Sequence, residues 1–187
     1  MKKKQLSVRE LVETEHSRQN VSRVIKLVGD DQKQFDELMK IFLGDDEELA
    51  RRAAWSIGYI AQDHPQLVKK WFPKLIGNLE KPGQHPAIYR NTFRFMQVIE
   101  IPEQHVASVL DAAYRYILNA GNTAAVRAFA LTTASNVVSA YPELAPELRL
   151  VAEQVMMENS KAMISRGKRT LRELDKLTGK QESAPKH

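Results

Sequence analysis

The sequence predicts an all-α protein, and three observations lead to this fold class. Apolar residues recur with a helical period along nearly the whole chain. These stretches begin at residues that cap helices and end at glycine or proline. No run of Val, Ile and Thr with period two lies between turn residues, as a strand would require. The chain therefore reads as a series of capped amphipathic helices.

The stretch from residue 44 to residue 82 is the clearest of these elements and reads as helix, corner, helix. We expect its first helix over residues 47–62, capped by Asp45 or Asp46 and ended by the His64-Pro65 pair. Its apolar stripe consists of Leu49, Ala53, Ile57 and Ile60. The second helix, over residues 66–79, contains Pro73, for which we expect a kink. Such a pair cannot bury its apolar stripe alone, so it needs a copy of itself as a neighbour.

Two capping boxes organise the chain before this stretch. Ser7 and Glu10 form the first, which begins a helix. The polar run over residues 13–20 either breaks that helix or is its exposed part, before the apolar stripe resumes and ends at Gly29. The second box, over residues 31–34, begins a helix that ends at Gly44. The helix boundaries in this region are therefore predicted with definite caps.

Prolines and a glycine turn divide the remainder of the chain. The loop over residues 81–86 contains two prolines and a glycine, and Pro102, Pro142 and Gly121 mark later boundaries. We expect helices over residues 87–100, 103–119, 124–140, 143–158 and 161–177. The last residues, 178–187, have almost no apolar side chains and are predicted to form a mobile tail.

Charge is distributed unevenly along the 187 residues. The chain carries a net charge of +5, but residues 1–28 contribute +4 and residues 160–187 contribute +5, which leaves residues 29–159 at −4. Affinity for a phosphate backbone comes from clustered cations. A mildly acidic body is therefore a poor candidate for a continuous nucleic-acid groove, and nucleic acid is the less favoured partner.

Several classes of function lack their local signatures. The chain has no cysteine, and its five histidines never stand three or four residues apart, so we expect no metal site. Nucleotide-binding glycine loops and a serine-nucleophile motif are absent, so we expect no cofactor and assign no catalytic residue. No apolar run long enough to cross a membrane occurs. The basic start has no apolar run behind it, and we therefore expect a cytoplasmic protein.

A repeat of a little under forty residues runs through the chain. Its markers are Arg52, Arg90, Arg127 and Arg166, at spacings of 38, 37 and 39, and Pro65, Pro102 and Pro142, at spacings of 37 and 40. This period and its two-helix content resemble the HEAT-repeat family of α-solenoids. That family carries a proline-kinked first helix, as at Pro73, and an arginine within an Ala-rich run near the start of the second, as in Arg52-Ala53-Ala54.

The resemblance covers about residues 31–177 and implies a right-handed α-α superhelix. We expect about four helix pairs preceded by an N-terminal helix, in a single domain over residues 1–180 whose residues 1–30 form an N-terminal cap region. The family's usual loop aspartate, six residues before the arginine, is met only by Asp46. We therefore do not expect a continuous Asp–Arg ladder between repeats.

Function is predicted to be binding of a protein or peptide partner. Second helices of the pairs are expected to line the concave face and to offer an acidic partner the side chains of Arg51, Arg52, Arg90, Arg94 and Arg127. The alternative for these arginines is a solvated face or pairing between repeats. A scaffold or an oligomer contact is a further class of function that the sequence leaves open.

A DNA-binding function is the other alternative. A group of bacterial DNA glycosylases for alkylated bases also looks like a HEAT solenoid and uses Trp with an acid in a basic concave face. That resemblance implies Trp55, Trp71 and Asp111 as candidates, together with the arginines at 52, 90, 94 and 127. Packing between helices is the simpler role for both tryptophans. The basic helix over residues 161–177 contacts nucleic acid or an acidic partner, or else closes the last repeat.

Overall fold

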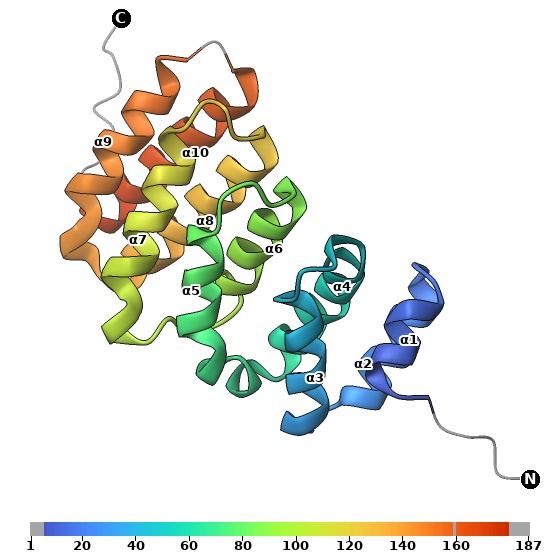
Figure 1. Cartoon of the computed structure of the whole chain (residues 1–187). Helices are drawn as coiled ribbons and strands as arrows, with labels where there is room; N and C mark the ends of the chain where they lie inside the picture. Colours follow the sequence, from blue (N-terminus) through green and yellow to red (C-terminus); the bar gives the residue numbers. More distant parts are fainter. Residues whose placement is uncertain (1–5, 159, 180–187) are drawn as a thin grey trace, which may run out of the picture. The chain divides into compact units, whose positions relative to one another are not determined.

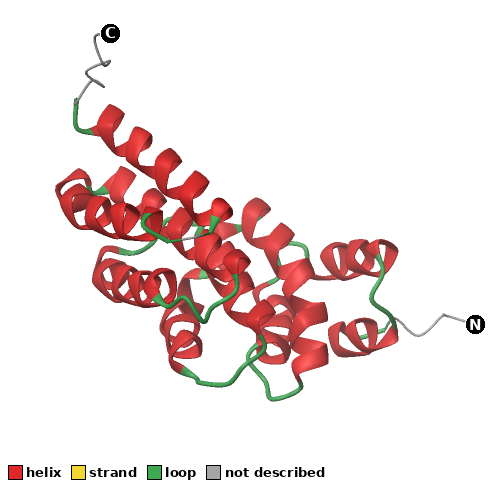
Figure 2. Cartoon of the chain, turned by 90° about the horizontal axis from the view of Figure 1, so that it is seen from above, coloured by secondary structure: helices red, strands yellow, loops and turns green. Residues whose placement is uncertain are grey.

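The computed structural model describes residues 6–158 and 160–179. This part of the chain is helical and contains no strand (Figures 1 and 2). Its α-helices are α1 (Val8–Thr14), α2 (Arg18–Val28), α3 (Gln32–Phe42), α4 (Glu47–Asp63), α5 (Phe72–Glu80), α6 (Pro86–Met96), α7 (Glu103–Leu118), α8 (Ala124–Ala140), α9 (Ala145–Met156) and α10 (Lys161–Leu177). The 3-10 turns are η1 (Pro65–Leu67), η2 (Lys69–Trp71) and η3 (Pro142–Leu144). The predicted all-α fold class is confirmed.

The helices pack as pairs in each of two compact units, residues 1–102 and residues 103–187. In the first unit α1 packs on α2, α3 on α4 and α5 on α6, while α2, α4 and α6 follow one another side by side. The second unit repeats this plan, because α7 packs on α8, α9 on α10, α7 on α9 and α8 on α10. Each unit therefore has a layer of first helices and a layer of second helices, as an α-solenoid requires.

The N-terminal region is a helix pair and not a single capping helix. Ser17 begins α2, and its hydroxyl accepts a hydrogen bond from the backbone N–H of Asn20 at 3.1 Å. The buried Asn20 side chain donates in turn to the carbonyl of Leu11 at 2.6 Å, which ties α2 to α1. The polar run thus breaks the helix, and the described residues contain five helix pairs where about four were expected.

The expectation of a proline-kinked helix over residues 66–79 is wrong. Two 3-10 turns occupy residues 65–71, and α5 begins only at Phe72. Pro73 therefore stands in the first turn of α5, where a backbone N–H has no helical partner and the fixed φ of proline suits the helix. The ring causes no kink because no intrahelical bond is lost.

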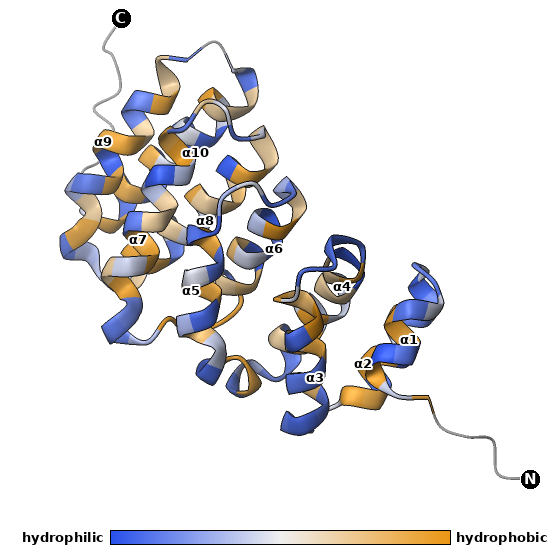
Figure 3. Cartoon of the chain, viewed as in Figure 1, coloured by the Kyte–Doolittle hydropathy of each residue, from blue (hydrophilic) through white to orange (hydrophobic). Residues whose placement is uncertain are grey.

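The core of each unit follows the apolar stripes of its helices. Bands of opposite hydropathy alternate along the helices in Figure 3. In the first unit the rings of Phe42 and Phe95 meet edge to face, with centroids 5.1 Å apart, and both are fully buried. The predicted tail over residues 178–187 lies, from residue 180 on, outside the part that the structure describes.

Candidate functional site

The layer of second helices in the first unit presents arginines and aromatic rings to solvent. We call this surface the α4–α6 face and define it by Arg51, Arg52, Trp55, Tyr59, Arg90 and Arg94. The first four lie on α4 and the last two on α6. Tyr59 is 43% exposed, and Trp55, Arg90 and Arg94 are half-buried. Such a mixture of cations and partly covered rings is typical of surfaces that recognise a partner.

Helical spacing explains why these side chains share a face. Apart from its first two residues, α6 buries its side chains except for those of Arg90 and Arg94, which stand one turn apart. On α4 the buried positions are mostly alanine and isoleucine, which leaves Arg52, Trp55 and Tyr59 at spacings of three and four on the opposite side. The core therefore determines which side chains form this face, because buried residues occupy the remaining sides of both helices.

The arginines of α4 already have contacts. Glu48 accepts from the Nε of Arg52 at 3.0 Å and lies 3.8 Å from a terminal nitrogen of Arg51. Arg52 also donates to the carbonyl of Glu13 at 3.1 Å, which joins α4 to the end of α1. One carboxylate thus serves two guanidinium groups, and this part of the face keeps a positive charge.

The arginines of α6 differ from these. No acid in the described ranges forms an ion pair with Arg90 or Arg94. The guanidinium of Arg94 lies over Gly58 of α4, where a Cβ atom would stand 3.7 Å from its Cζ and Nε atoms. Two half-buried cations one turn apart repel each other and are only partly hydrated, so an anion placed between them would be stabilised.

Trp55 is held at the edge of this face. Its ring and that of His16 have centroids 5.1 Å apart with planes tilted by 36°. His16 belongs to the short connection between α1 and α2, so the contact covers part of the indole and leaves the remainder half-buried. The ring is therefore positioned by packing and still partly accessible.

Arg127, the fifth arginine predicted for binding, has a different role. It lies on α8 in the second unit, is 4% exposed and donates two hydrogen bonds to Glu158, at 2.6 and 2.7 Å. Its Nε donates a third to the carbonyl of Ile117 at 2.6 Å. The hydrogen bonds that Arg127 donates to the carboxylate of Glu158 lower the pKa of Glu158, against the opposing effect of burial. Arg127 therefore forms a pair between repeats, which was the alternative predicted for it, and little of its side chain is exposed.

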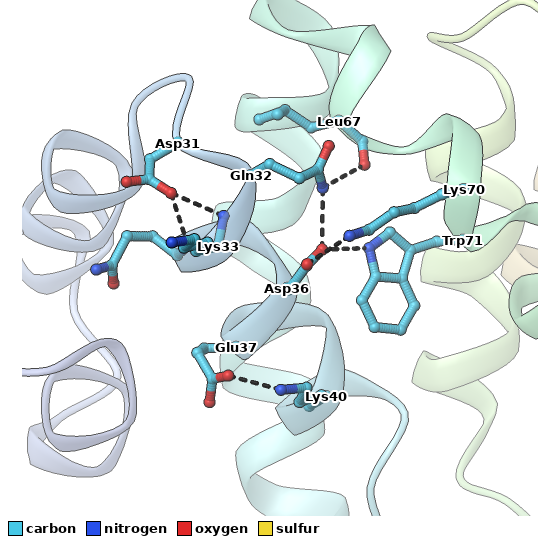
Figure 4. A network of polar contacts seen from close by, with 10 residues as sticks. Asp31, Gln32, Lys33, Asp36, Glu37, Lys40, Leu67, Lys70 and Trp71 are labelled. Atoms are coloured by element: carbon cyan, nitrogen blue, oxygen red, sulfur yellow. Dashed lines mark hydrogen bonds and ion pairs between the residues drawn. The ribbon is translucent and has the colours of Figure 1, made fainter.

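Trp71 is also engaged within the fold (Figure 4). Its indole N–H donates to Asp36 at 3.0 Å, and the same carboxylate accepts from Gln32 and Lys70. Although burial opposes the shift, these three hydrogen bonds together lower the pKa of Asp36. At 5% exposure the ring has no open face on which a base could stack. The network ties η2 to α3.

Asp111, the remaining candidate of the DNA-binding alternative, lies on α7 in the second unit. Its side chain is 75% exposed and forms an ion pair with Arg115 at 3.3 Å. Trp55 and Trp71 contact different elements, so the structure does not bring the two tryptophans together.

Two further features are absent from the described residues. No group of histidine and acidic side chains is arranged to hold a metal ion. None of the helices combines the length and the hydropathy needed to cross a bilayer.

Tyr59 was not among the residues predicted for the site. The sequence does indicate that Tyr59 is exposed beside Trp55, because residue 59 stands four positions after Trp55 and away from the apolar stripe of α4. An aromatic residue at such a position is exposed by the same periodicity that buries Ile57 and Ile60.

Comparison with known proteins adds one finding. A family model described as a HEAT repeat domain matches residues 8–174. No curated protein and no solved structure matches the chain.

Proposed function

We propose that this chain, which belongs to the HEAT repeat domain family, is a non-catalytic interaction module that binds an acidic segment of a protein or peptide on its α4–α6 face. Such domains are commonly protein-interaction modules. The observation that supports this choice most is the pair of arginines on α6, half-buried and without an acid among the described residues. If Arg90 and Arg94 had a structural role, we would expect an acidic partner for them, as Glu158 is for Arg127.

The spacing of the two arginines on α6 supports a segment with two acidic residues. Side chains one turn apart on a helix stand about 6 Å from each other, so two carboxylates at a similar separation would contact Arg90 and Arg94 together. Glutamates two apart in an extended peptide, or four apart in a helical one, meet this condition. Tyr59 and Trp55 add apolar surface for a neighbouring residue, since tyrosine and tryptophan carry much of the binding energy in protein interfaces.

The test is a fluorescence anisotropy titration with labelled synthetic peptides of equal length. One series carries two glutamates at either spacing with leucine beside them, and a matched series carries glutamine instead. We expect the glutamate peptides to bind. The double substitution R90E/R94E should lower their affinity at least about tenfold, since each charge contact contributes on the order of 1 kcal/mol. Added salt should weaken binding because the contacts are partly exposed.

A matched control keeps the charge change but moves it to another surface. Lys33 and Lys69 are exposed and have no ion pair in the part of the chain that the structure describes, so K33E/K69E alters the net charge equally. This variant should bind as the wild type does. Equal binding by R90E/R94E and the wild type would contradict the proposal, and so would binding of a DNA duplex in preference to every acidic peptide.

A further inference from the structure

The layer of first helices contains a groove that the proposed function does not use. We call it the α3–α5 groove; it has a volume of about 460 Å³ and is lined by Lys40, Leu43, Trp71, Lys74, Gly77, Asn78 and Lys81. These residues come from the end of α3, from η2 and from α5 with the residue that follows it. The volume is in the range of small-molecule sites. All of it lies within the first unit.

Charge in this groove has one sign. Three of its seven lining residues are lysines, and none is an acid. Lys40 pairs with Glu37 at 2.7 Å, whereas Lys74 and Lys81 form no ion pair with any described acid. Two other hollows of the protein differ, because Asp45 and Glu47 line one and Asp175 lines the other. A groove in which two ammonium groups have no acidic partner among the described residues favours an anionic occupant.

The groove also has a rigid apolar wall. Trp71, at 5% exposure, contributes the small exposed part of its ring, which the bond from its N–H to Asp36 holds in one orientation (Figure 4). The ammonium group of Lys74 lies 4.9 Å from the ring centroid, in the range of a cation–π contact. Leu43 provides further apolar surface. A cation held beside an aromatic wall suits a ligand that is charged at one end and flat and apolar at the other.

We propose that the α3–α5 groove binds a small organic anion with a flat apolar body, whose charge is a carboxylate or a phosphate. The lysines contact the charged group and the Trp71 wall contacts the body. This site is separate from the α4–α6 face, since its residues belong to first helices and to η2. Its failure and the failure of the proposed function can therefore be told apart.

Gly77 offers a way to close the groove without disturbing the fold. A Cβ atom built on Gly77 meets no atom within 4 Å, and the residue lies inside α5. Replacing a helical glycine usually raises helix stability. In the variant G77F the phenylalanine side chain should therefore occupy the groove while the protein stays folded. G77A leaves most of the volume open and is the matched control. K74E/K81E removes the positive charge in a separate variant.

The test follows the two indole N–H signals in a nitrogen–proton NMR spectrum, one from each tryptophan of the chain, assigned with W55F. The probes are 1-naphthoate and 1-naphthyl phosphate, which distinguish the two charged groups, with neutral 1-naphthol and inorganic phosphate as controls. We expect at least one naphthyl anion to shift the Trp71 signal and leave that of Trp55 in place. Neither control compound should do so at equal concentration.

The variants decide between the outcomes. G77F and K74E/K81E should each raise the dissociation constant at least about tenfold, which corresponds to about 1.4 kcal/mol, whereas G77A and R90E/R94E should leave it unchanged. The proposal is overturned if the naphthyl anions leave the Trp71 signal in place, if 1-naphthol shifts it equally, or if G77F binds as well as G77A. It is also overturned if only the acidic peptides shift the signal.

Discussion

The two units use the same residue types in opposite ways. In the first unit Arg90 and Arg94 lie at the surface without an acid among the described residues, whereas Arg127 in the second is buried on Glu158. Glycine shows the same contrast. Gly77 borders an open groove, while a Cβ atom on Gly167 would stand 2.6 Å from Met156 and 2.9 Å from the carbonyl of Ala152. Repeats built on one plan can therefore place an arginine or a glycine at an open position in one unit and in a close contact in the other.

The largest expected effect comes from removing the buried arginine. R127M should lower the free energy of unfolding by roughly 3 kcal/mol, because Glu158 would remain partly buried without its partner and Ile117 would lose a donor. R90M, the matched change on α6, should alter it by no more than about 0.5 kcal/mol. Urea denaturation followed by circular dichroism measures both, and equal effects would erase the contrast between the units.

The two glycines give the next comparison. G167A should destabilise the protein by about 1 kcal/mol or more, since overpacking costs about 1–3 kcal/mol. The better helix propensity of alanine offsets only part of this cost. G77A should instead stabilise by up to about 1 kcal/mol. Thermal unfolding of both variants provides the measurement, and a stabilised G167A would mean that α9 and α10 do not approach this closely.

Acid should weaken the arginine pair of the second unit. Glu158 has a lowered pKa in the folded protein because Arg127 donates to its carboxylate, an effect that burial partly opposes. A lowered pKa means that the stabilisation is present above the unfolded pKa, near 4.5, and is lost as the pH falls through the folded value. The stability difference between the wild type and E158Q should therefore be largest near neutral pH and shrink below about pH 4.5.

Urea midpoints of both proteins between neutral and acidic pH provide that measurement. A difference that stays constant over the range would show that ionisation of Glu158 does not contribute to folding.

Local rules predicted much of the fold. The capping box of Ser7 and Glu10 forms as expected, with both of its hydrogen bonds present, and Asp31 caps α3. α10 covers the predicted residues 161–177. Each of these features depends on residues within a few positions of one another, so sequence spacing is sufficient to find them. Pro73 was misread because its expected place was the middle of a helix, while the preceding residues form 3-10 turns.

The candidate site was less accessible to sequence reasoning. Periodicity predicted both Arg90 and Arg127 as binding residues. Only Arg127 is paired within the fold, and its partner Glu158 stands 31 residues away in the sequence. The α3–α5 groove likewise joins Lys40 to Lys74, which belong to different helix pairs. Such partners are fixed by how neighbouring pairs pack, and one sequence does not contain that information locally.

A charge exchange tests most directly whether the arginines of α6 recognise an acidic segment. The measurement is the affinity of R90E/R94E for the peptide in which both glutamates are replaced by lysine, compared with its affinity for the original peptide. We expect the lysine peptide to bind this variant and not the wild type, which would show that the paired charges meet. If the lysine peptide binds neither protein while the variant still folds, or binds both equally, the α4–α6 face is not where the acidic segment is recognised.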